Sequence, residues 1–210
     1  MVAARVPRYF TPEEYLTIER KAEFKSEYLC GEIYAMAGGS PSHGEIGANV
    51  IRELSYELKT SPCHTFTSDV KVRTDVAGLY SYPDVSIVCG EPQFHDENND
   101  VLTNPKLIVE VLSRDTEAYD RGKKFDMYQH LESLTDYLLV SQDEPVVTHY
   151  TKQDNGTWLR AVHEGMAAVV DIQSIGCKLS LAEVYLKIEF PKTKPAIWSD
   201  PRHGMSKLDR

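Results

Sequence analysis

The sequence predicts an α/β or α+β fold in which one mixed sheet is flanked by helices. Helix-like and strand-like segments follow in the order helix, strand, helix, several strands, helix, strands. The segment 107–112 is apolar at nearly every position, as in a central strand covered on both faces. The chain has 210 residues and no internal repeat, so we expect one domain over residues 1–190 and a loosely packed, proline-containing tail over 191–210.

The N-terminal part of the chain is expected to hold two helices with a strand between them. Thr11 followed by Pro12 is a typical helix start and predicts a helix that runs to about Ala22. A strand-like segment follows at 31–37, and a longer helix begins at Ser40. Its apolar side chains recur at helical spacing, at Ile46, Val50, Ile51, Leu54 and Leu58.

The rest of the domain is expected to consist mainly of strands. These strands are predicted at 65–67, 70–73, 84–88, 107–112, 137–140, 146–150 and 158–162. One helix at 116–131 interrupts the series, and a short helix at 181–186 ends it.

Composition limits the classes of function. The net charge of −9 and the pI near 5.3 disfavour a protein that holds nucleic acid over a long footprint. An enzyme with clustered carboxylates remains compatible, because a bound divalent cation offsets their charge. No apolar run reaches the roughly 18–20 residues of a membrane span. The N-terminus has no apolar block of the signal-peptide type, so a cytoplasmic location is expected.

The four cysteines give no sign of a metal site. Cys30, Cys63, Cys89 and Cys177 are scattered without a Cys-x-x-Cys spacing, which argues against zinc and against a secreted disulfide framework. Cys89 ends an apolar run, where we expect it to be a small buried hydrophobic residue.

Glu110 is the first candidate for chemistry. Alternation along the strand 107–112 places it on one face with Ile108 and Leu112, among aliphatic side chains. A buried carboxylate must be neutralised by a proton, a cation or a metal. The alternative to a functional role is a glutamate paired with a structural Arg or Lys.

Asp84 is the second candidate, at the start of the strand 84–88 and directly after Pro83. An Asp at this position is often only part of a turn. If the strands that carry Asp84 and Glu110 are neighbours, however, two hard oxygen donors meet at one point. Magnesium and calcium prefer such ligands.

Lys124 is the third candidate. On the predicted helix 116–131 it shares one face with Asp120, Met127, Tyr128 and Leu131. That face includes the inward, apolar residues. The alternative is a surface pair between Asp120 and Lys124 worth about 0.2–0.5 kcal/mol.

Glu27 and His43 are two further candidates from the N-terminal half. Glu27 lies between the first helix and the strand 31–37, where a solvated residue is the simple interpretation. His43 lies in the first turn of the long helix, on the face of Gly47, Val50 and Leu54. There it is either a capping or packing residue or part of an active site.

With these residues identified, the chain resembles the Uma-type family of restriction endonucleases (DUF820-like), a branch of the PD-(D/E)XK nuclease superfamily. The resemblance extends over about residues 10–190 and includes Glu27 with Gly31-Glu32, His43, Pro83-Asp84 and the segments 110–113 and 119–125. Pro-Asp alone is common. Followed by Ile-Val-Glu-Val-Leu-Ser and then Tyr-Asp-Arg-Gly-x-Lys-Phe, it is quite specific.

The resemblance implies a restriction-endonuclease-like mixed central sheet flanked by helices, with extra strands. It also implies hydrolysis of DNA phosphodiester bonds with Mg²⁺, for which Mn²⁺ could substitute. Asp84 and Glu110 would be the metal ligands and Glu27 an accessory catalytic acid. In the mechanism built on this site, we expect Asp120 and His43 to be supporting residues. The superfamily lysine two positions after the second acid is absent, since Leu112 stands there. Similarity to the Uma-type branch assigns that catalytic role to Lys124.

Two other functions compete with the nuclease. The first is a catalytically inactive relative of the same fold that acts as a nucleic-acid or protein interaction module. The second is a hydrolase that uses paired carboxylates as acid and base, for example on a glycoside. A nuclease that cuts both strands of a duplex is expected to act as a homodimer.

Overall fold

The computed structural model describes residues 9–74 and 78–190, and the strands in these ranges form two large sheets and one hairpin. From one edge to the other, the six-stranded sheet contains β11 (Trp158–Glu164), β10 (Val146–Lys152), β9 (Asp136–Val140), β8 (Leu107–Val111), β6 (Val85–Cys89) and β3 (Cys63–Thr67). Its neighbours are antiparallel except β8 and β9, which are parallel. The predicted mixed sheet is confirmed.

The described strands divide among three sheets, although the sequence predicted one. The five-stranded sheet contains β2 (Glu32–Ala35), β1 (Ser26–Leu29), β5 (Leu79–Ser81), β4 (Lys71–Thr74) and β7 (Val101–Leu102). The hairpin consists of β12 (Val169–Ile172) and β13 (Cys177–Ser180). The strands β1, β5, β7, β12 and β13 were not predicted, because two to four residues are too few to show a clear alternation.

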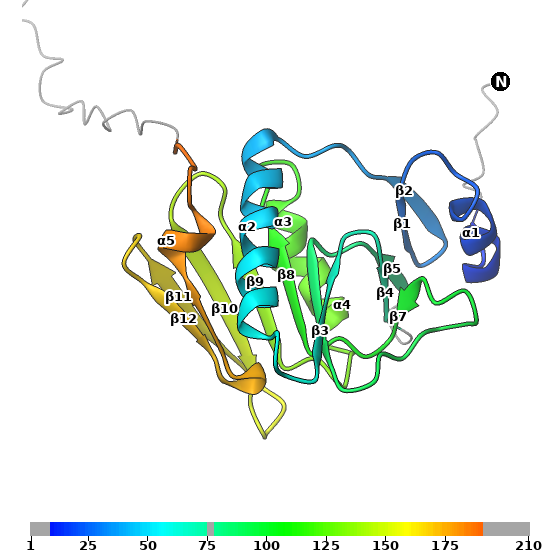
Figure 1. The fold of residues 1–210 in the computed structure, drawn as a ribbon. Helices are drawn as coiled ribbons and strands as arrows, with labels where there is room; N and C mark the ends of the chain where they lie inside the picture. Colours follow the sequence, from blue (N-terminus) through cyan, green and yellow to red (C-terminus); the bar gives the residue numbers. More distant parts are fainter. Residues whose placement is uncertain (1–8, 75–77, 191–210) are drawn as a thin grey trace, which may run out of the picture.

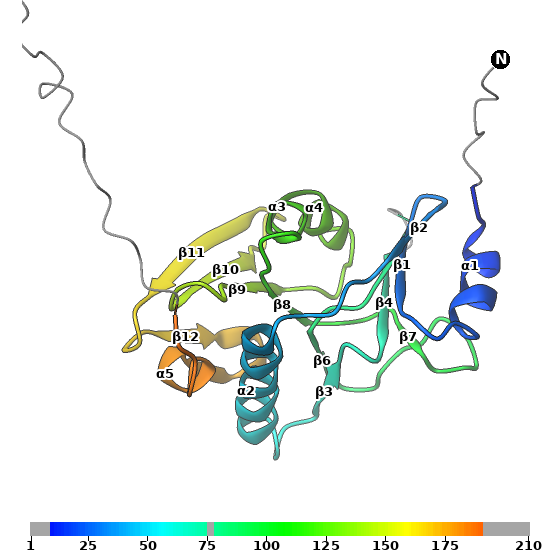
Figure 2. The same cartoon turned by 90° about the horizontal axis from the view of Figure 1, so that it is seen from above.

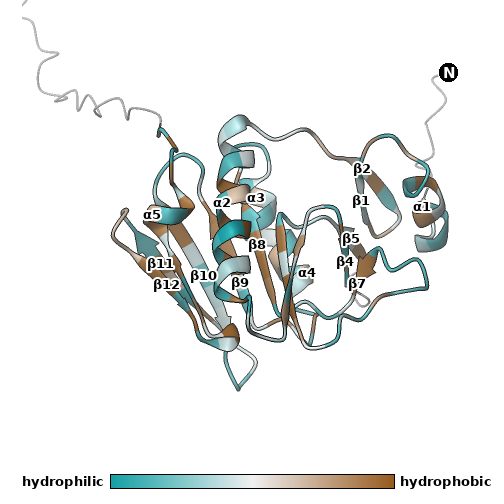
Figure 3. Cartoon of the chain, in the orientation of Figure 1, coloured by the Kyte–Doolittle hydropathy of each residue, from teal (hydrophilic) through white to brown (hydrophobic). Residues whose placement is uncertain are grey.

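Helices lie on both faces of the six-stranded sheet (Figures 1 and 2). The helix α2 (Pro41–Glu57) covers one face, and its N-cap Ser40 accepts a hydrogen bond from the backbone N–H of His43. Its buried apolar residues pack against alternate residues of the sheet, in a cluster that includes Ile46, Val50, Leu54, Leu107, Val109 and Val111. In Figure 3, α2 shows polar residues on its outer side while β8 behind it is apolar.

The opposite face of β8 is covered by the segment that follows it. Ile108 and Leu112 pack there with Phe125, Tyr128 and Tyr137. Since apolar clusters cover both faces of β8, the prediction of a central, doubly covered strand is confirmed.

This covering segment is not the continuous α-helix predicted at 116–131. It consists of α3 (Glu117–Tyr119), a π-helical turn η1 (Asp120–Lys124) and α4 (Phe125–Tyr128). Gly122 lies inside the π-helical turn, where glycine weakens an α-helix by about 1 kcal/mol relative to alanine. Wider turns of this kind occur frequently at functional sites.

The remaining helices are short. They are α1 (Pro12–Glu19), the 3₁₀ turn η2 (Gln173–Ile175) and α5 (Leu181–Val184). Each predicted strand overlaps an observed one, with ends that differ by a few residues, whereas α1 ends before the expected Ala22. The predicted tail 191–210 lies outside the described residues. In the described ranges no helix has both the length and the hydropathy needed to cross a membrane.

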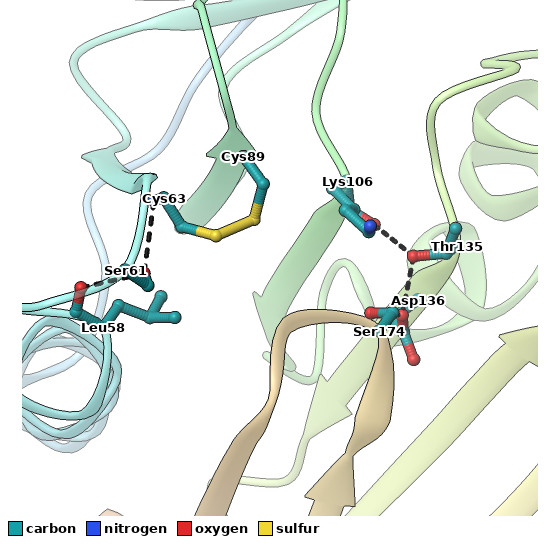
Figure 4. The surroundings of a disulfide bond; sticks show 8 residues. All are labelled: Leu58, Ser61, Cys63, Cys89, Lys106, Thr135, Asp136 and Ser174. Atoms are coloured by element: carbon teal, nitrogen blue, oxygen red, sulfur yellow. Dashed lines mark hydrogen bonds between the residues drawn. A yellow bond between two sulfur atoms is a disulfide. The ribbon is translucent and has the colours of Figure 1, made fainter.

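A disulfide joins Cys63 on the edge strand β3 to Cys89 at the end of β6 (Figure 4). The two residues face each other in the antiparallel pairing of these strands. The expectation that Cys89 is simply a buried hydrophobic residue was therefore wrong. The partner comes from a strand 26 positions earlier, and spacing along the chain does not reveal such a pairing.

Candidate active site

The pairing of β6 with β8 brings the two predicted acids together. Val85 is opposite Val109, so extending this register by one residue places Asp84 opposite Glu110. Asp84 Oδ2 accepts a hydrogen bond of 2.7 Å from the backbone N–H of Val111. Asp84, which directly precedes β6, is thus held at the end of β8, near enough for its charge to contribute to the raised pKa of Glu110.

Lys124 lies at the centre of the cluster. Its Nζ is 2.9 Å from Glu110 Oε1, 3.1 Å from Glu27 Oε1 and 3.7 Å from Asp120 Oδ1. The side chain of Lys124 is only 6% exposed, so this ammonium depends on the carboxylates around it for solvation. A surface pair with Asp120, the simple alternative, does not describe this arrangement.

Glu110 is held by a second contact that the sequence did not indicate. The hydroxyl of Tyr128 donates to Glu110 Oε1 at 3.1 Å and is itself 2.8 Å from Ser81 Oγ. Tyr128 was recognised only as part of the inward helix face. Ser81 comes from β5, a strand that was not predicted.

Glu27 belongs to β1 and not to a loop between helix and strand, which corrects the sequence-based placement. Its Oε1 accepts a hydrogen bond of 3.2 Å from the backbone N–H of Tyr82 in addition to the ion pair with Lys124. The five-stranded sheet therefore contributes one acid to a cluster in which Glu110 comes from β8 and Asp120 and Lys124 come from η1.

Burial and charge perturb the groups of the cluster. Burial raises the pKa of Glu110 to about 8, although the positive charge of Lys124 opposes this change. Burial likewise raises the pKa of Asp120. For Lys124, burial lowers the pKa, but the carboxylates of Glu110, Glu27 and Asp120 outweigh it and hold the pKa well above its usual value. Lys124 therefore carries a positive charge at neutral pH.

His43 contacts the other end of the cluster. Its Nε2 is 2.9 Å from Asp84 Oδ1, and this hydrogen bond raises the pKa of His43 although burial lowers it. The contact places His43 beside a predicted metal ligand and adds to its role in the first turn of α2.

A groove of about 640 Å³ opens beside Asp84 and His43. One wall is formed by the start of α2 and the residues before it, and another by the bend before β1 and the end of β3. The groove gives the Asp84 end of the cluster access to solvent. Glu110 and Lys124 remain behind it with about 5% of their side chains exposed.

The donor set is suitable for magnesium. Glu27, Glu110 and Asp120 place three carboxyl groups around the ammonium of Lys124. Asp84 adds a fourth carboxyl group whose charge acts on Glu110, and hard oxygen donors are the ligands that Mg²⁺ prefers. In the described part of the chain, no three His, Cys, Asp or Glu side chains are grouped so as to hold a metal. Magnesium needs only one or two carboxylates together with water or phosphate, so Asp84 and Glu110 are sufficient.

The mixed sheet between helices, with acids from neighbouring strands, defines a restriction-endonuclease-like fold. A solved structure with this fold, a "putative nuclease belonging to DUF820" from Anabaena variabilis ATCC 29413, matches with a TM-score of 0.68. It shares 21% sequence identity, and the match covers 84% of this chain and 97% of the other. At this identity the similarity establishes the fold alone.

A family model assigns the chain more closely. The Uma2 model, described as "Putative restriction endonuclease", matches residues 12–182, and the protein belongs to this family. Two similar relatives come from Synechocystis sp. (strain ATCC 27184 / PCC 6803 / Kazusa). The uncharacterized protein slr1290 is 38% identical over 86% of this chain and 93% of its own length, and the uncharacterized protein sll1609 is 36% identical over 76% and 90%.

Proposed function

We propose that the protein is a metal-dependent endonuclease that hydrolyses DNA phosphodiester bonds. The observation that supports this most is the contact of Lys124 with Glu110 and Glu27. The superfamily's lysine two positions after the second acid is replaced by Leu112, which lies in the apolar core. Lys124, which belongs to the helical segment after β8, instead brings its ammonium group to Glu110. Family membership and the fold of the DUF820 structure support the same function.

Asp84 and Glu110 are the residues that would hold Mg²⁺, or Mn²⁺ in its place. When bound, the metal would neutralise phosphate charge and lower the pKa of a water molecule that attacks the phosphorus. Glu27, which is 14% exposed, is an accessory acid that shares Lys124 with Glu110. The excess of carboxylates over cations in this cluster favours a divalent cation.

Lys124 and its neighbours act on the phosphate and on the attacking water. The fixed ammonium of Lys124 would stabilise the negative charge that develops on the phosphate oxygens, or orient the water. Asp120, 3.7 Å from that ammonium, helps to keep it charged and in place. His43 fixes one oxygen of Asp84 and so orients the other toward the backbone of Val111.

A non-catalytic interaction module with the same fold is the second candidate. It is favoured by one observation: in the described ranges the acids do not form a three-ligand metal cluster, and Lys124 bridges Glu27 and Glu110. In such a protein the cluster would only stabilise the fold. Nuclease activity that depends on these acids separates the two functions.

The test is nicking of supercoiled plasmid in Mg²⁺ and in Mn²⁺ by the wild type, Asp84→Asn and Glu110→Gln. Asp126→Asn is the matched control, because Asp126 is an exposed acid on the same helical segment as Lys124. We expect both site variants to lose at least about a hundredfold in rate, and Asp126→Asn to match the wild type. Folded wild type that cuts neither the plasmid nor a single-stranded oligonucleotide in either metal would contradict the proposal and favour the interaction module.

A further inference from the structure

An aromatic side chain on the rim of the groove is unusually exposed. Phe24 lies in the bend between α1 and β1, lines the groove that contains Asp84 and His43, and is 79% exposed. Burying a phenylalanine stabilises a protein by about 1.5–3 kcal/mol, so folding alone gives no reason for such a position. A flat apolar ring beside a proposed phosphodiesterase site suits the face of a nucleobase.

The groove offers open space beside this ring. Gly38, Gly44 and Gly47 line it, and a Cβ atom added to any of them would have no neighbour within 4 Å. At these three glycines the wall of the groove is therefore formed by backbone atoms, with open space above them. The volume of about 640 Å³ lies in the range of about 300–1,000 Å³ that is usual for ligand pockets.

The charge of the groove disfavours the binding of duplex DNA through its phosphates. The lining of the groove contains two side chains that can carry a positive charge, Lys25 and His43, and both have acidic partners. Lys25 Nζ is 2.6 Å from Asp69 Oδ1, and His43 is paired with Asp84. Duplex binders depend on neutralising many phosphates with Lys and Arg, whereas a single strand is held by base stacking on aromatic rings in addition to positive charge.

We propose that this groove binds single-stranded DNA, with an unpaired base stacked on Phe24 and the backbone leading toward Asp84. The inference rests on the proposed function, because it takes DNA as the substrate, and it specifies the form of that DNA. A paired base presents only its edge to a protein, so the ring can be used fully only where the strands are separated.

The experiment measures binding apart from cleavage. A short fluorescein-labelled oligothymidylate and a blunt duplex of the same length are titrated with protein in Ca²⁺, and the fluorescence anisotropy is recorded. The proteins are the wild type, Phe24→Ala, Phe24→Trp and Tyr56→Ala. Tyr56 is the matched control, because it is 62% exposed on α2 and does not line the groove.

We expect the wild type to bind the single strand more tightly than the duplex. Phe24→Ala should weaken that binding by about tenfold or more, Phe24→Trp should retain it, and Tyr56→Ala should leave it unchanged. Tighter binding of the duplex, or equal binding by Phe24→Ala and the wild type, would overturn the inference. So would a change of sedimentation in Phe24→Ala, which would make Phe24 a contact between two copies of the chain.

Failure of this inference can be told apart from failure of the proposed function. If nicking requires Asp84 but the binding of oligothymidylate does not depend on Phe24, the proposed nuclease function is retained and the single-strand inference is rejected. If oligothymidylate binds through Phe24 but no DNA is cleaved, the groove is supported as a single-strand binding site and the proposed nuclease function is contradicted.

Discussion

At the scale of single residues, the ammonium of Lys124 is the centre of the site. It joins Glu27, Glu110 and Asp120, although these acids come from β1, β8 and η1. Charged groups without solvent around them are stable only when such partners are present. The contact between Lys124 and Glu110 is therefore the feature from which a catalytic role is most directly inferred.

Replacing Lys124 tests whether this ammonium acts in cleavage. We expect Lys124→Met to lower plasmid nicking by at least about a hundredfold, because it removes the fixed positive charge at the phosphate. It should also destabilise the fold by about 3–5 kcal/mol, since the buried acids lose their partner. Lys124→Arg keeps the charge and serves as a second variant that is expected to fold. Lys123→Met is the matched control on the exposed side; equal nicking by it and by Lys124→Met would contradict the role.

The raised pKa of Glu110 predicts how stability depends on pH. In metal-free protein the folded state keeps this proton up to pH about 8, whereas the unfolded chain loses it near 4.5. The folded state thus binds more protons between these values, so the contribution of Glu110 to stability falls as pH rises. Urea unfolding in EDTA across this range should show a smaller decline for Glu110→Gln than for the wild type. Parallel curves would show that Glu110 titrates normally.

At the scale of elements, the sequence predicted the strand that directly follows Asp84, the strand that carries Glu110 and the helical face that carries Lys124. The alternation in 107–112 and the i, i+4 spacing were sufficient for this, since both are local patterns. The π-helical turn η1 was not predicted, because its wider hydrogen bonding has no clear sequence pattern. The hydrogen bond between His43 and Asp84 joins residues 41 positions apart and likewise could not be read locally.

The N-cap of α2 offers a test at this scale. Ser40 Oγ accepts a hydrogen bond of 3.1 Å from the backbone N–H of His43. We expect Ser40→Ala to lower stability by about 1 kcal/mol, and the melting temperature by about 2–4 °C. Ser42→Ala, one residue inside the helix, is the control that does not remove the cap. A melting temperature for Ser40→Ala equal to that of this control would show that the cap contributes nothing.

At the scale of the whole molecule, the site forms where the two large sheets meet. Glu27 comes from the five-stranded sheet, while Glu110 belongs to the six-stranded one. The pairing of short strands such as β1 and β5 depends on contacts between residues about 50 positions apart, which a local pattern cannot specify. Resemblance to the Uma-type family indicated Glu27, whereas alternation and spacing did not.

The disulfide between Cys63 and Cys89 also acts on the whole molecule, since it closes the chain across 26 positions. A cross-link of this length is expected to stabilise the fold by about 3 kcal/mol, mainly by restricting the unfolded chain. Urea unfolding should therefore shift to lower denaturant when reductant is added, and Cys63→Ser should not respond to reductant. Equal unfolding of the wild type with and without reductant would show that the bond does not contribute.

The central claim is that Asp84 and Glu110 hold a divalent metal, and calorimetric titration of Mn²⁺ tests it most directly. Wild type, Asp84→Asn, Glu110→Gln and the control Asp126→Asn are titrated at a pH above the raised pKa of Glu110, where its carboxylate is ionised. We predict binding by the wild type and by Asp126→Asn, and no measurable binding by the other two. Folded wild type that binds no Mn²⁺, or site variants that bind it as the wild type does, would contradict the claim.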